Sequence, residues 1–380
     1  MTDTTDNPLK LDNPDLFRSL AYIDGAWVGA DDGATFEVSN PADGAVLTTV
    51  PNQDVAETRR AIEAADTAWP AWRSKTAKER AAILRSWFNL MIENKDDLAR
   101  IMTAEQGKPL AESAGEVLYG ASFIEWFAEE GKRIYGDVIP THMPDRRIIV
   151  IKQPVGVVAC ITPWNFPNAM ITRKAGPALA AGCTVVIKPA SETPLSALAL
   201  AVLAEQAGIP AGVFNIITTT NSRDTGVELT ESPLVRKFSF TGSTGVGKQL
   251  IRQCASTVKK VSMELGGNAP FIVFDDADID AAVQGAVISK YRNAGQTCVC
   301  TNRFYVQDAV YDEFVEKFTA AVRNLKVGRG DEAGVNIGPM ISESAVEKVE
   351  ELLADSIAKG ADVVEGGHRH ELGGHFYQPT

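Results

Sequence analysis

The segment NAGQTCVC, residues 293–300, places two thiols one residue apart behind a turn-forming sequence. A cysteine becomes a nucleophile when its pKa is lowered or when a base lies beside it. Because Asn-Ala-Gly-Gln-Thr favours a turn, we expect Cys298 to follow the end of a helix and not to lie in a core. The chain has only four histidines, His142 and three near its C-terminus, so a Cys–His pair is disfavoured. Any base for Cys298 is therefore expected to be a carboxylate.

Two other interpretations of Cys298 and Cys300 stay open from spacing alone. A buried, unreactive pair is the general expectation for cysteine. The pair could also supply two zinc ligands, but a structural zinc site needs about four. The remaining ligands would have to come from scattered positions or from a glycine-rich turn region: Cys160, Cys183, Cys254, His368, His370 and His375. We therefore predict that the chain has no metal site.

The segment VSMELGGNAP contains a candidate base, Glu264, between Met263 and Leu265. Apolar surroundings raise the pKa of a carboxylate, which would make Glu264 a usable general base near neutral pH. The alternative is a glutamate at the end of a strand that faces water.

The segment ITPWNFP holds Trp164, Asn165 and Phe166 between two prolines. Proline fixes the backbone, so this loop could aim the Asn165 amide at an oxyanion that develops during a reaction. The alternative is a structural turn with an aromatic plug.

Two further segments are candidates for nucleotide binding. FTGSTGVGKQ spaces its glycines like a P-loop, but Gln249 stands where a Mg²⁺-binding serine or threonine is required, so an NTPase is disfavoured. What remains is a turn at Gly242 and Ser243 before a helix N-terminus, whose amides can hold a pyrophosphate. In VVIKPASETP, Lys188 and Ser191 stand where a dinucleotide site places an acid on the ribose. They would favour a 2′-phosphate, although Glu192 weakens that preference.

The elements that must position these residues follow an α/β pattern. From residue 156 onward, short apolar strands such as CTVVIK alternate with helical segments such as PLSALALAVLAEQAG, which predicts parallel sheets covered by helices. Residues 54–131 are helix-rich, and apolar spacing over 77–102 predicts one long amphipathic helix. Residues 139–153 predict a β-hairpin, and the first ~20 residues are expected to form a loose arm.

Composition narrows the class of protein. A net charge of −12 and a pI near 5.0 argue against a nucleic-acid partner, which needs a basic face. The sequence contains neither a signal-peptide pattern nor an apolar run approaching the roughly 20 residues that span a membrane. Five cysteines, mostly scattered, do not form a disulfide framework. We predict a cytoplasmic protein of two or three domains with no membrane partner.

Together these motifs resemble the aldehyde dehydrogenase superfamily along nearly the whole chain. The segments that carry the resemblance are PWNFP, KPASETP, FTGST, ELGG and GQTC, and the separation of Glu264 from Cys298 matches the family. The resemblance implies a Rossmann-type cofactor domain from residues 1–138 and 154–263. It also implies an oligomerisation hairpin over 139–153 and an α/β catalytic domain over 264–380. A homodimer or homotetramer is the implied assembly.

The resemblance also implies the chemistry. The Cys298 thiolate would add to an aldehyde carbon, while the Asn165 amide and the Cys298 backbone N–H hold the oxyanion. Hydride would pass to NADP or NAD, and Glu264 would activate the water that hydrolyses the thioester. Within the family, serine instead of glutamate at position 191 implies a preference for NADP over NAD. Family cofactor contacts fall on Trp164, Lys188, Ser191, Gly242, Ser243 and the Leu265 backbone.

Within the superfamily, ITRKAGPALAAGCTVVIKPAS and KYRNAGQTCVCTNRFYVQ are most similar to the succinate-semialdehyde dehydrogenases. That branch implies that Arg173 and Arg292 bind the far carboxylate of the aldehyde, a task that suits the guanidinium fork. Two ordinary surface arginines are the alternative. Glutarate semialdehyde stays open as the substrate because charge does not define chain length. A non-catalytic subunit also stays open.

Two more expectations come from the resemblance. Relatives with TCVC imply that Cys300 forms a reversible, inhibitory disulfide with Cys298, although such a bridge is geometrically tight. Family members also continue beyond the final GGHFYQPT with a Glu-x-Phe-Gly-Pro segment, the rest of the catalytic domain, a strand that pairs with a partner's sheet and a substrate-binding serine. We expect the 380 residues alone to be poorly active and prone to aggregate through an open strand edge.

Overall fold

The computed structural model describes residues 8–380. Its main sheet has seven strands in the order β11-β10-β7-β8-β9-β1-β2. The first five of these run parallel, and β1 and β2 are antiparallel additions at one edge. The strands are β1 (Ala21–Ile23), β2 (Ala26–Val28), β7 (Val157–Ile161), β8 (Thr184–Lys188), β9 (Phe214–Ile216), β10 (Val235–Thr241) and β11 (Lys260–Glu264).

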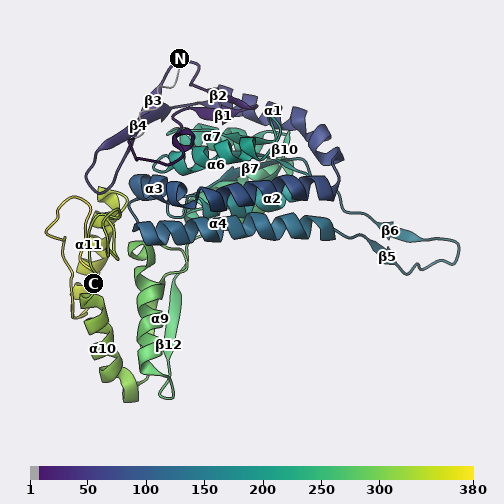
Figure 1. The fold of residues 1–380 in the computed structure, drawn as a ribbon. Coiled ribbons are helices and arrows are strands. Elements are labelled where there is room, and N and C mark those ends of the chain that lie inside the picture. The colour runs from purple at the N-terminus through teal and green to yellow at the C-terminus, as the bar shows by residue number, and fades with distance from the viewer. Residues whose placement is uncertain (1–7) are drawn as a thin grey trace.

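Side-chain alternation along the central strands explains why helices cover both faces of the sheet. Val158 of β7 points into one core and Val157 into the other, as successive residues of a strand must. The first core lies under α5 (Ala169–Ala180) and α6 (Pro194–Gln206), which are covered in turn by α2 (Ala77–Glu93), α3 (Lys95–Gln106) and α4 (Leu110–Glu130). The second core lies under α1 (Val55–Ser74), α7 (Ser222–Glu231) and α8 (Thr244–Cys254). The predicted α/β fold is confirmed (Figure 1).

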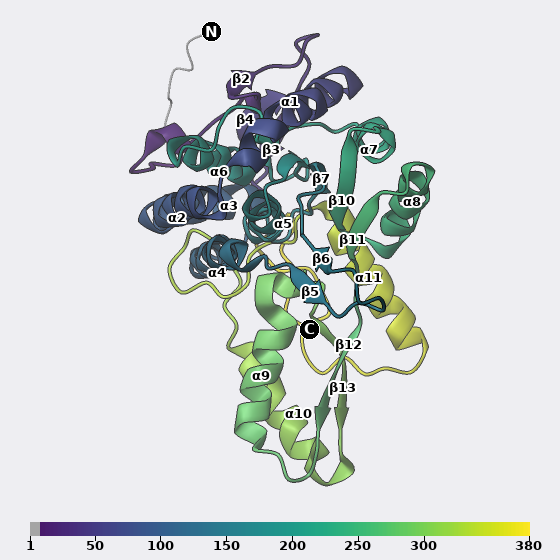
Figure 2. The same cartoon turned by 90° about the vertical axis from the view of Figure 1, so that its right-hand side faces the viewer.

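A smaller α/β lobe projects from this body (Figure 2). Its parallel strands β12 (Ala269–Val273) and β13 (Thr301–Val306) are joined through α9 (Ile279–Tyr291), and α10 (Asp308–Arg323) packs on them. The helix α11 (Glu343–Ala358) follows. Ile272, Phe274 and Tyr305 of this lobe are more than half exposed. Such a surface is the kind that we expect to promote aggregation, which stays a prediction.

Two antiparallel strand pairs lie outside the sheets above. One is β3 (Thr35–Ser39) with β4 (Val46–Pro51). The other, β5 (Asp137–Ile139) with β6 (Ile148–Val150), forms the hairpin arm that extends away from the body in Figure 1. Val138, Ile149 and Ile151 on this arm are largely exposed. Short 3₁₀ turns complete the described chain: η1 (Pro14–Leu16), η2 (Gly131–Arg133), η3 (Ala255–Thr257) and η4 (Arg292–Gly295).

The single long helix predicted over residues 77–102 is wrong, because the chain breaks into α2 and α3 at Asn94. The Asn94 side chain donates to the Leu90 carbonyl at 2.8 Å and accepts a hydrogen bond from Asn13 at 2.9 Å. Asparagine competes in this way for backbone groups that a helix needs. Asn13, which is far away in the sequence, thus helps to stabilise the break at Asn94. The apolar periodicity of residues 77–102 cannot reveal such a contact.

The loose arm predicted for the first ~20 residues is also wrong where the structure describes it; residues 1–7 lie outside the described part. Leu11 and Leu16 are buried in the first core. The buried Asp97 carboxylate accepts hydrogen bonds from the backbone amides of Asp12 (3.0 Å) and Asn13 (2.7 Å). These two bonds fasten the arm to α3.

We predict that Asp97→Asn destabilises the protein by about 1–3 kcal/mol, because one of the two arm amides loses its acceptor inside the fold. The measurement is the midpoint of urea unfolding. Asp96→Asn is the matched control, since the Asp96 side chain is 72% exposed. Equal midpoints for the two variants would contradict this role for Asp97.

Candidate active site

The candidate site residues gather at the carboxyl edge of the parallel strands. Chain order runs from β7 through β8 to β9 in one direction, then returns to β10 and β11 on the other side of β7. Ligands of open α/β sheets bind where the strand order reverses in this way. Thr162 directly follows β7 and Thr241 ends β10, and both hydroxyls are buried without a partner among the described residues. Two unpaired buried hydroxyls at this reversal point fit a polar ligand there.

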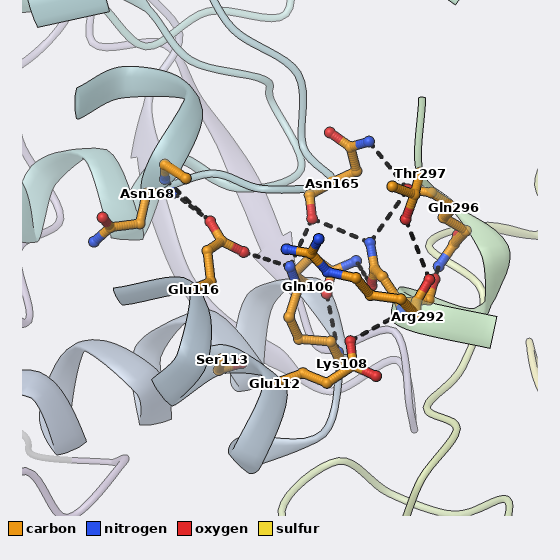
Figure 3. Close-up of polar contacts among 12 residues, drawn as sticks. Gln106, Lys108, Glu112, Ser113, Glu116, Asn165, Asn168, Arg292, Gln296 and Thr297 are labelled. Carbon is orange, nitrogen blue, oxygen red and sulfur yellow. Dashed lines mark hydrogen bonds and ion pairs between the residues drawn. The ribbon is translucent and has the colours of Figure 1, made fainter. Parts of the chain in front are cut away.

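The loop after β7 and the loop before Cys298 are hydrogen-bonded to each other. The Asn165 side-chain amide donates to the Gln296 carbonyl at 3.0 Å. The Asn293 side-chain amide donates to the Asn165 carbonyl at 3.1 Å. An amide nitrogen carries two N–H groups, so the bond to Gln296 leaves one N–H of Asn165 for another acceptor. The structure thus brings Asn165 and the Cys298 loop together (Figure 3).

The chain before Cys298 has a strained backbone. Asn293, Ala294 and Gly295 have φ values of 53°, 54° and 76°, in the left-handed region. Alanine rarely adopts this conformation, so surrounding contacts must impose it. Asn293 is 1% exposed and supplies those contacts: its backbone N–H donates to Glu112 at 2.8 Å, and its side-chain oxygen accepts from Gln106 at 2.9 Å.

The two neighbouring cysteines have different surroundings. Both are free thiols; Cys298 is half-buried and Cys300 is buried. The Cys300 thiol donates to the Lys290 carbonyl at 3.1 Å, and burial raises its pKa. A buried thiol whose pKa is raised is a weak nucleophile. Cys300 is therefore less suited to covalent chemistry than the more accessible Cys298. The reversible disulfide between them stays a prediction.

Glu264 ends β11 and is exposed, so the described residues do not form the apolar enclosure expected around its carboxylate. It lines a cavity of about 570 Å³ together with Arg173, Lys174 and Ser239. The glycines after it reach the cysteine loop, because a Cβ on Gly267 would lie 2.7 Å from the Cys298 carbonyl oxygen. The ELGG segment and Cys298 are therefore neighbours.

Lys174 was not among the predicted site residues. Burial lowers its pKa to about 8, although the charges of Cys160 and Glu264 oppose the shift. Its ammonium donates to Ser239 at 3.1 Å. In the sequence Lys174 lies on an alanine-rich helix, and neither motif nor spacing marks it as buried.

The two predicted substrate arginines contact one small apolar cluster, formed by Phe166, Ala169 and Met170. The Arg292 guanidinium lies 4.6 Å from the centre of the Phe166 ring, which directly follows Asn165. The Arg173 guanidinium contacts the Met170 sulfur at 3.9 Å and donates to the Tyr119 hydroxyl at 2.6 Å. The structure therefore places both arginines around the segment that carries Asn165.

The residues predicted to bind the dinucleotide lie at the ends of four strands, β7, β8, β10 and β11. Trp164 is half-buried in the loop after β7, and Lys188 is the buried last residue of β8. Ser191, just beyond, donates to the Glu192 carboxylate at 3.1 Å.

After β10, Ser243 caps the exposed N-terminus of α8 by accepting from the Val246 amide. Gly242 packs so closely on the Phe240 ring that a Cβ would collide with it. Leu265 packs against the second core.

The cysteines and the C-terminal histidines do not converge. Among residues 8–380, no group of three or more histidine, cysteine or acidic side chains could hold a metal ion. In the same part of the chain, no helix has the length and apolar character needed to cross a membrane.

The reversal of strand order, with helices on both faces and polar residues at the carboxyl edge, defines a doubly wound α/β enzyme. The family model described as "Aldehyde dehydrogenase family" matches residues 27–380, and the chain belongs to this family. The resemblance drawn from the motifs is confirmed, and the reaction class is aldehyde oxidation.

Relatives of known activity cover almost the whole chain. A glutarate-semialdehyde dehydrogenase of Pseudomonas aeruginosa is 67% identical over 98% of this chain and 77% of its own length. Succinate-semialdehyde dehydrogenase [NADP(+)] GabD of Escherichia coli is 66% identical with the same coverage. A crystal structure of an NADP-dependent enzyme of E. coli superimposes with a TM-score of 0.96 at 66% identity, covering 97% of this chain and 77% of that one.

We predict that the free energy of unfolding rises with pH between about 8 and 10.5 because of Lys188. Burial lowers its pKa from 10.5 to about 8, although Glu192 opposes the shift. Between these values the unfolded chain binds a proton that the folded chain does not, so folding becomes more favourable as pH rises. Lys188→Met should show a smaller rise, because only the contribution of the buried Lys174 then remains, and should be more stable at pH 7 by on the order of 1–3 kcal/mol. Urea unfolding at pH 7 to 10.5 measures both effects.

Lys248→Met is the control, because Lys248 is exposed on α8. Identical pH dependence for the wild type and Lys188→Met would contradict the assignment to Lys188.

Proposed function

We propose that this protein oxidises a short aldehyde that carries a carboxylate at its far end, with succinate semialdehyde as the first candidate and NADP as the preferred cofactor over NAD. The observation that carries the proposal is the contact of Arg173 and Arg292 with one cluster beside Asn165. Two guanidinium groups around the Asn165 loop suit a substrate with an anionic end near the reacting carbonyl. Glutarate semialdehyde is the second candidate, because a relative named as a glutarate-semialdehyde dehydrogenase is 67% identical.

The catalytic roles that we assign follow from position. Cys298, half-buried behind a rigid loop, forms the bond to the aldehyde carbon. The Asn165 amide and the Cys298 backbone N–H donate to the oxygen of the adduct, which gains negative charge as the bond forms. Glu264, whose segment adjoins Cys298, takes the proton of the water that cleaves the thioester. The exposure of its carboxylate leaves it open to water.

The described residues fit a dinucleotide. The unpaired hydroxyls of Thr162 and Thr241 mark the reversal point, and the exposed amides at the α8 N-terminus can hold a pyrophosphate. Trp164, Gly242 and the Leu265 backbone are assigned to the same site. When bound, the dinucleotide supplies the acceptor for the hydride that leaves the aldehyde carbon. Lys188 and Ser191 are assigned to its ribose, where an ammonium group and a hydroxyl can bind a 2′-phosphate.

We infer the same division of the chain as the sequence predicts. Residues 1–138 and 154–263 form the cofactor domain, and all seven strands of the main sheet lie there apart from Glu264, the last residue of β11. Residues 264–380 form the catalytic domain. The hairpin over 139–153, with Ile149 and Ile151 exposed, supports a homodimer or homotetramer that buries it. The free thiols support a reducing compartment, the cytoplasm.

The substrate assignment predicts a charge preference. Initial rates of NADPH formation at 340 nm should favour succinate or glutarate semialdehyde over uncharged butanal or pentanal. Arg173→Met and Arg292→Met should each lower kcat/KM for the carboxylated aldehydes by about 10–100-fold and leave that for butanal nearly unchanged. Cys298→Ala should abolish turnover of all of them.

Arg60→Met is the matched control, because Arg60 forms an exposed ion pair with Asp31. Equal losses for charged and uncharged aldehydes would show that the two arginines do not bind the substrate carboxylate. Turnover by Cys298→Ala at the wild-type rate would disprove the proposed function.

The cofactor assignment predicts that Ser191→Glu shifts the preference from NADP towards NAD. A second carboxylate beside Glu192 would repel the 2′-phosphate, so the ratio of kcat/KM for NADP to that for NAD should fall at least about 10-fold. Kinetics with each cofactor at saturating aldehyde measures the ratio. Ser191→Ala removes the hydroxyl without adding charge and should change the ratio less; an unchanged ratio in Ser191→Glu would place the 2′-phosphate elsewhere.

A further inference from the structure

A fully buried ion pair lies beside the candidate site and has no role in the chemistry assigned above. Lys108 follows α3 and Glu116 lies on α4, and their side chains are 0% and 1% exposed. Burial lowers the pKa of Lys108, and the charge of Glu116 opposes that shift. Two apolar residues of similar size would often be at least as stable as a buried ion pair. The specific hydrogen bonds of this pair are therefore the place to look for its function.

The pair contacts both ends of the segment that carries Asn165 (Figure 3). The Lys108 ammonium lies 2.5 Å from Glu116 and donates to the Asn165 carbonyl at 2.6 Å. The other Glu116 oxygen accepts from the backbone amides of Asn168 (2.9 Å) and Ala169 (3.2 Å). These amides begin α5, where a carboxylate is favourable. The pair thus holds the segment from Asn165 to Ala169 at both ends.

The same stretch of chain also holds the cysteine loop. Gln106 donates to the Asn293 side-chain oxygen at 2.9 Å and accepts from the Lys108 amide at 3.0 Å. The Glu112 carboxylate accepts a hydrogen bond from the backbone N–H of Asn293 at 2.8 Å. Asn293 in turn donates to the carbonyls of Asn165 and Gln296. Residues 106–116 therefore touch both loops whose relative position decides whether Asn165 can reach an oxyanion formed at Cys298.

We propose that the Lys108–Glu116 pair is a positioning device that holds the Asn165 loop against the Cys298 loop at the spacing needed for oxyanion stabilisation. The catalytic part of this proposal rests on the proposed function. Two apolar side chains could fill the same space but could not donate to the Asn165 carbonyl, which is the junction between the two loops. The Lys108 ammonium also lies 4.1 Å from the centre of the Phe166 ring, which Arg292 contacts as well. The pair therefore supports the segment that orients a substrate arginine.

Two variants separate positioning from mere stability. Lys108→Met leaves the Glu116 charge buried without its partner, so both stability and kcat should fall. The double variant Lys108→Met/Glu116→Gln removes both charges but keeps an oxygen for the α5 amides. It should recover most of the thermal midpoint, while kcat stays about 100-fold low, the scale expected when reacting groups are misplaced by about 1 Å. The KM for the aldehyde should stay near the wild-type value, because the lost interaction acts in the transition state.

Recovery of kcat together with the thermal midpoint in the double variant would overturn the proposal, because the pair would then act only through stability. Lys359→Met is the matched control, since Lys359 is 73% exposed and pairs with Asp355 on the surface. Gln106→Met removes no charge and should lower kcat about 10-fold by loosening Asn293. The Gln106→Met variant therefore still tests the positioning role if Lys108→Met does not fold.

Hydrogen exchange supplies a readout that does not need turnover. In the double variant and in Gln106→Met, the amides of Asn165, Phe166, Asn168 and Ala169 and of residues 293–298 should exchange at least about 10-fold faster, while those of α8 stay unchanged. Unchanged exchange in both loops would overturn the proposal, as would faster exchange with wild-type kcat. If the wild-type protein oxidises no aldehyde, the proposed function fails, and exchange alone decides whether the pair holds the two loops together.

Discussion

The reversal of strand order between β7 and β10 is the constraint on which the candidate site depends. The connections after these two neighbouring strands lead to helices on opposite faces of the sheet, so the space beyond their carboxyl ends is not filled by a crossing connection. The Asn165 loop follows β7, and the turn at Gly242 follows β10. Lys188 and Glu264 end the strands on either side. One topological feature thus assembles residues as far apart in the chain as Asn165 and Glu264, which are 99 positions apart.

Two buried carboxylates and a half-buried one on α3 and α4 then organise the backbone around that space. Glu105 accepts from the amides of Leu195 and Ser196 at the start of α6, and Glu116 does the same for α5. Glu112 accepts from the Asn293 amide before Cys298. The first amides of a helix have no partner within the helix, so a carboxylate there removes an unpaired buried group. Burial raises the pKa of Glu105 to about 8, because a charge is unfavourable so deep in the fold.

Several of these features work against stability. Lys174 and Lys188 are buried lysines whose pKa values fall to about 8, and Ala294 holds a left-handed backbone. Each is a local cost that the surrounding fold must offset. Lys188 lies at the carboxyl edge, Lys174 bonds to Ser239 of β10 and Ala294 lies in the turn before Cys298, whereas the central strands are packed with aliphatic side chains. Such a distribution is expected where a rigid scaffold carries reactive groups.

The residue types and local spacing by themselves determined much of this protein: the alternation of strands and helices, the loop of Trp164 and Asn165 between two prolines, the glycine turn before α8 and the turn before Cys298. These are short-range properties, and each depends on a few consecutive residues. Tertiary structure alone decided the break at Asn94, the docking of residues 12 and 13 on Asp97, the burial of Lys174 and the Lys108–Glu116 pair. Each of these depends on contacts between residues that are far apart in the chain, such as Lys108 and Asn165. The local spacing of residues cannot predict such contacts. A lysine between a glycine and a proline looks like a solvated turn residue until the fold closes over it.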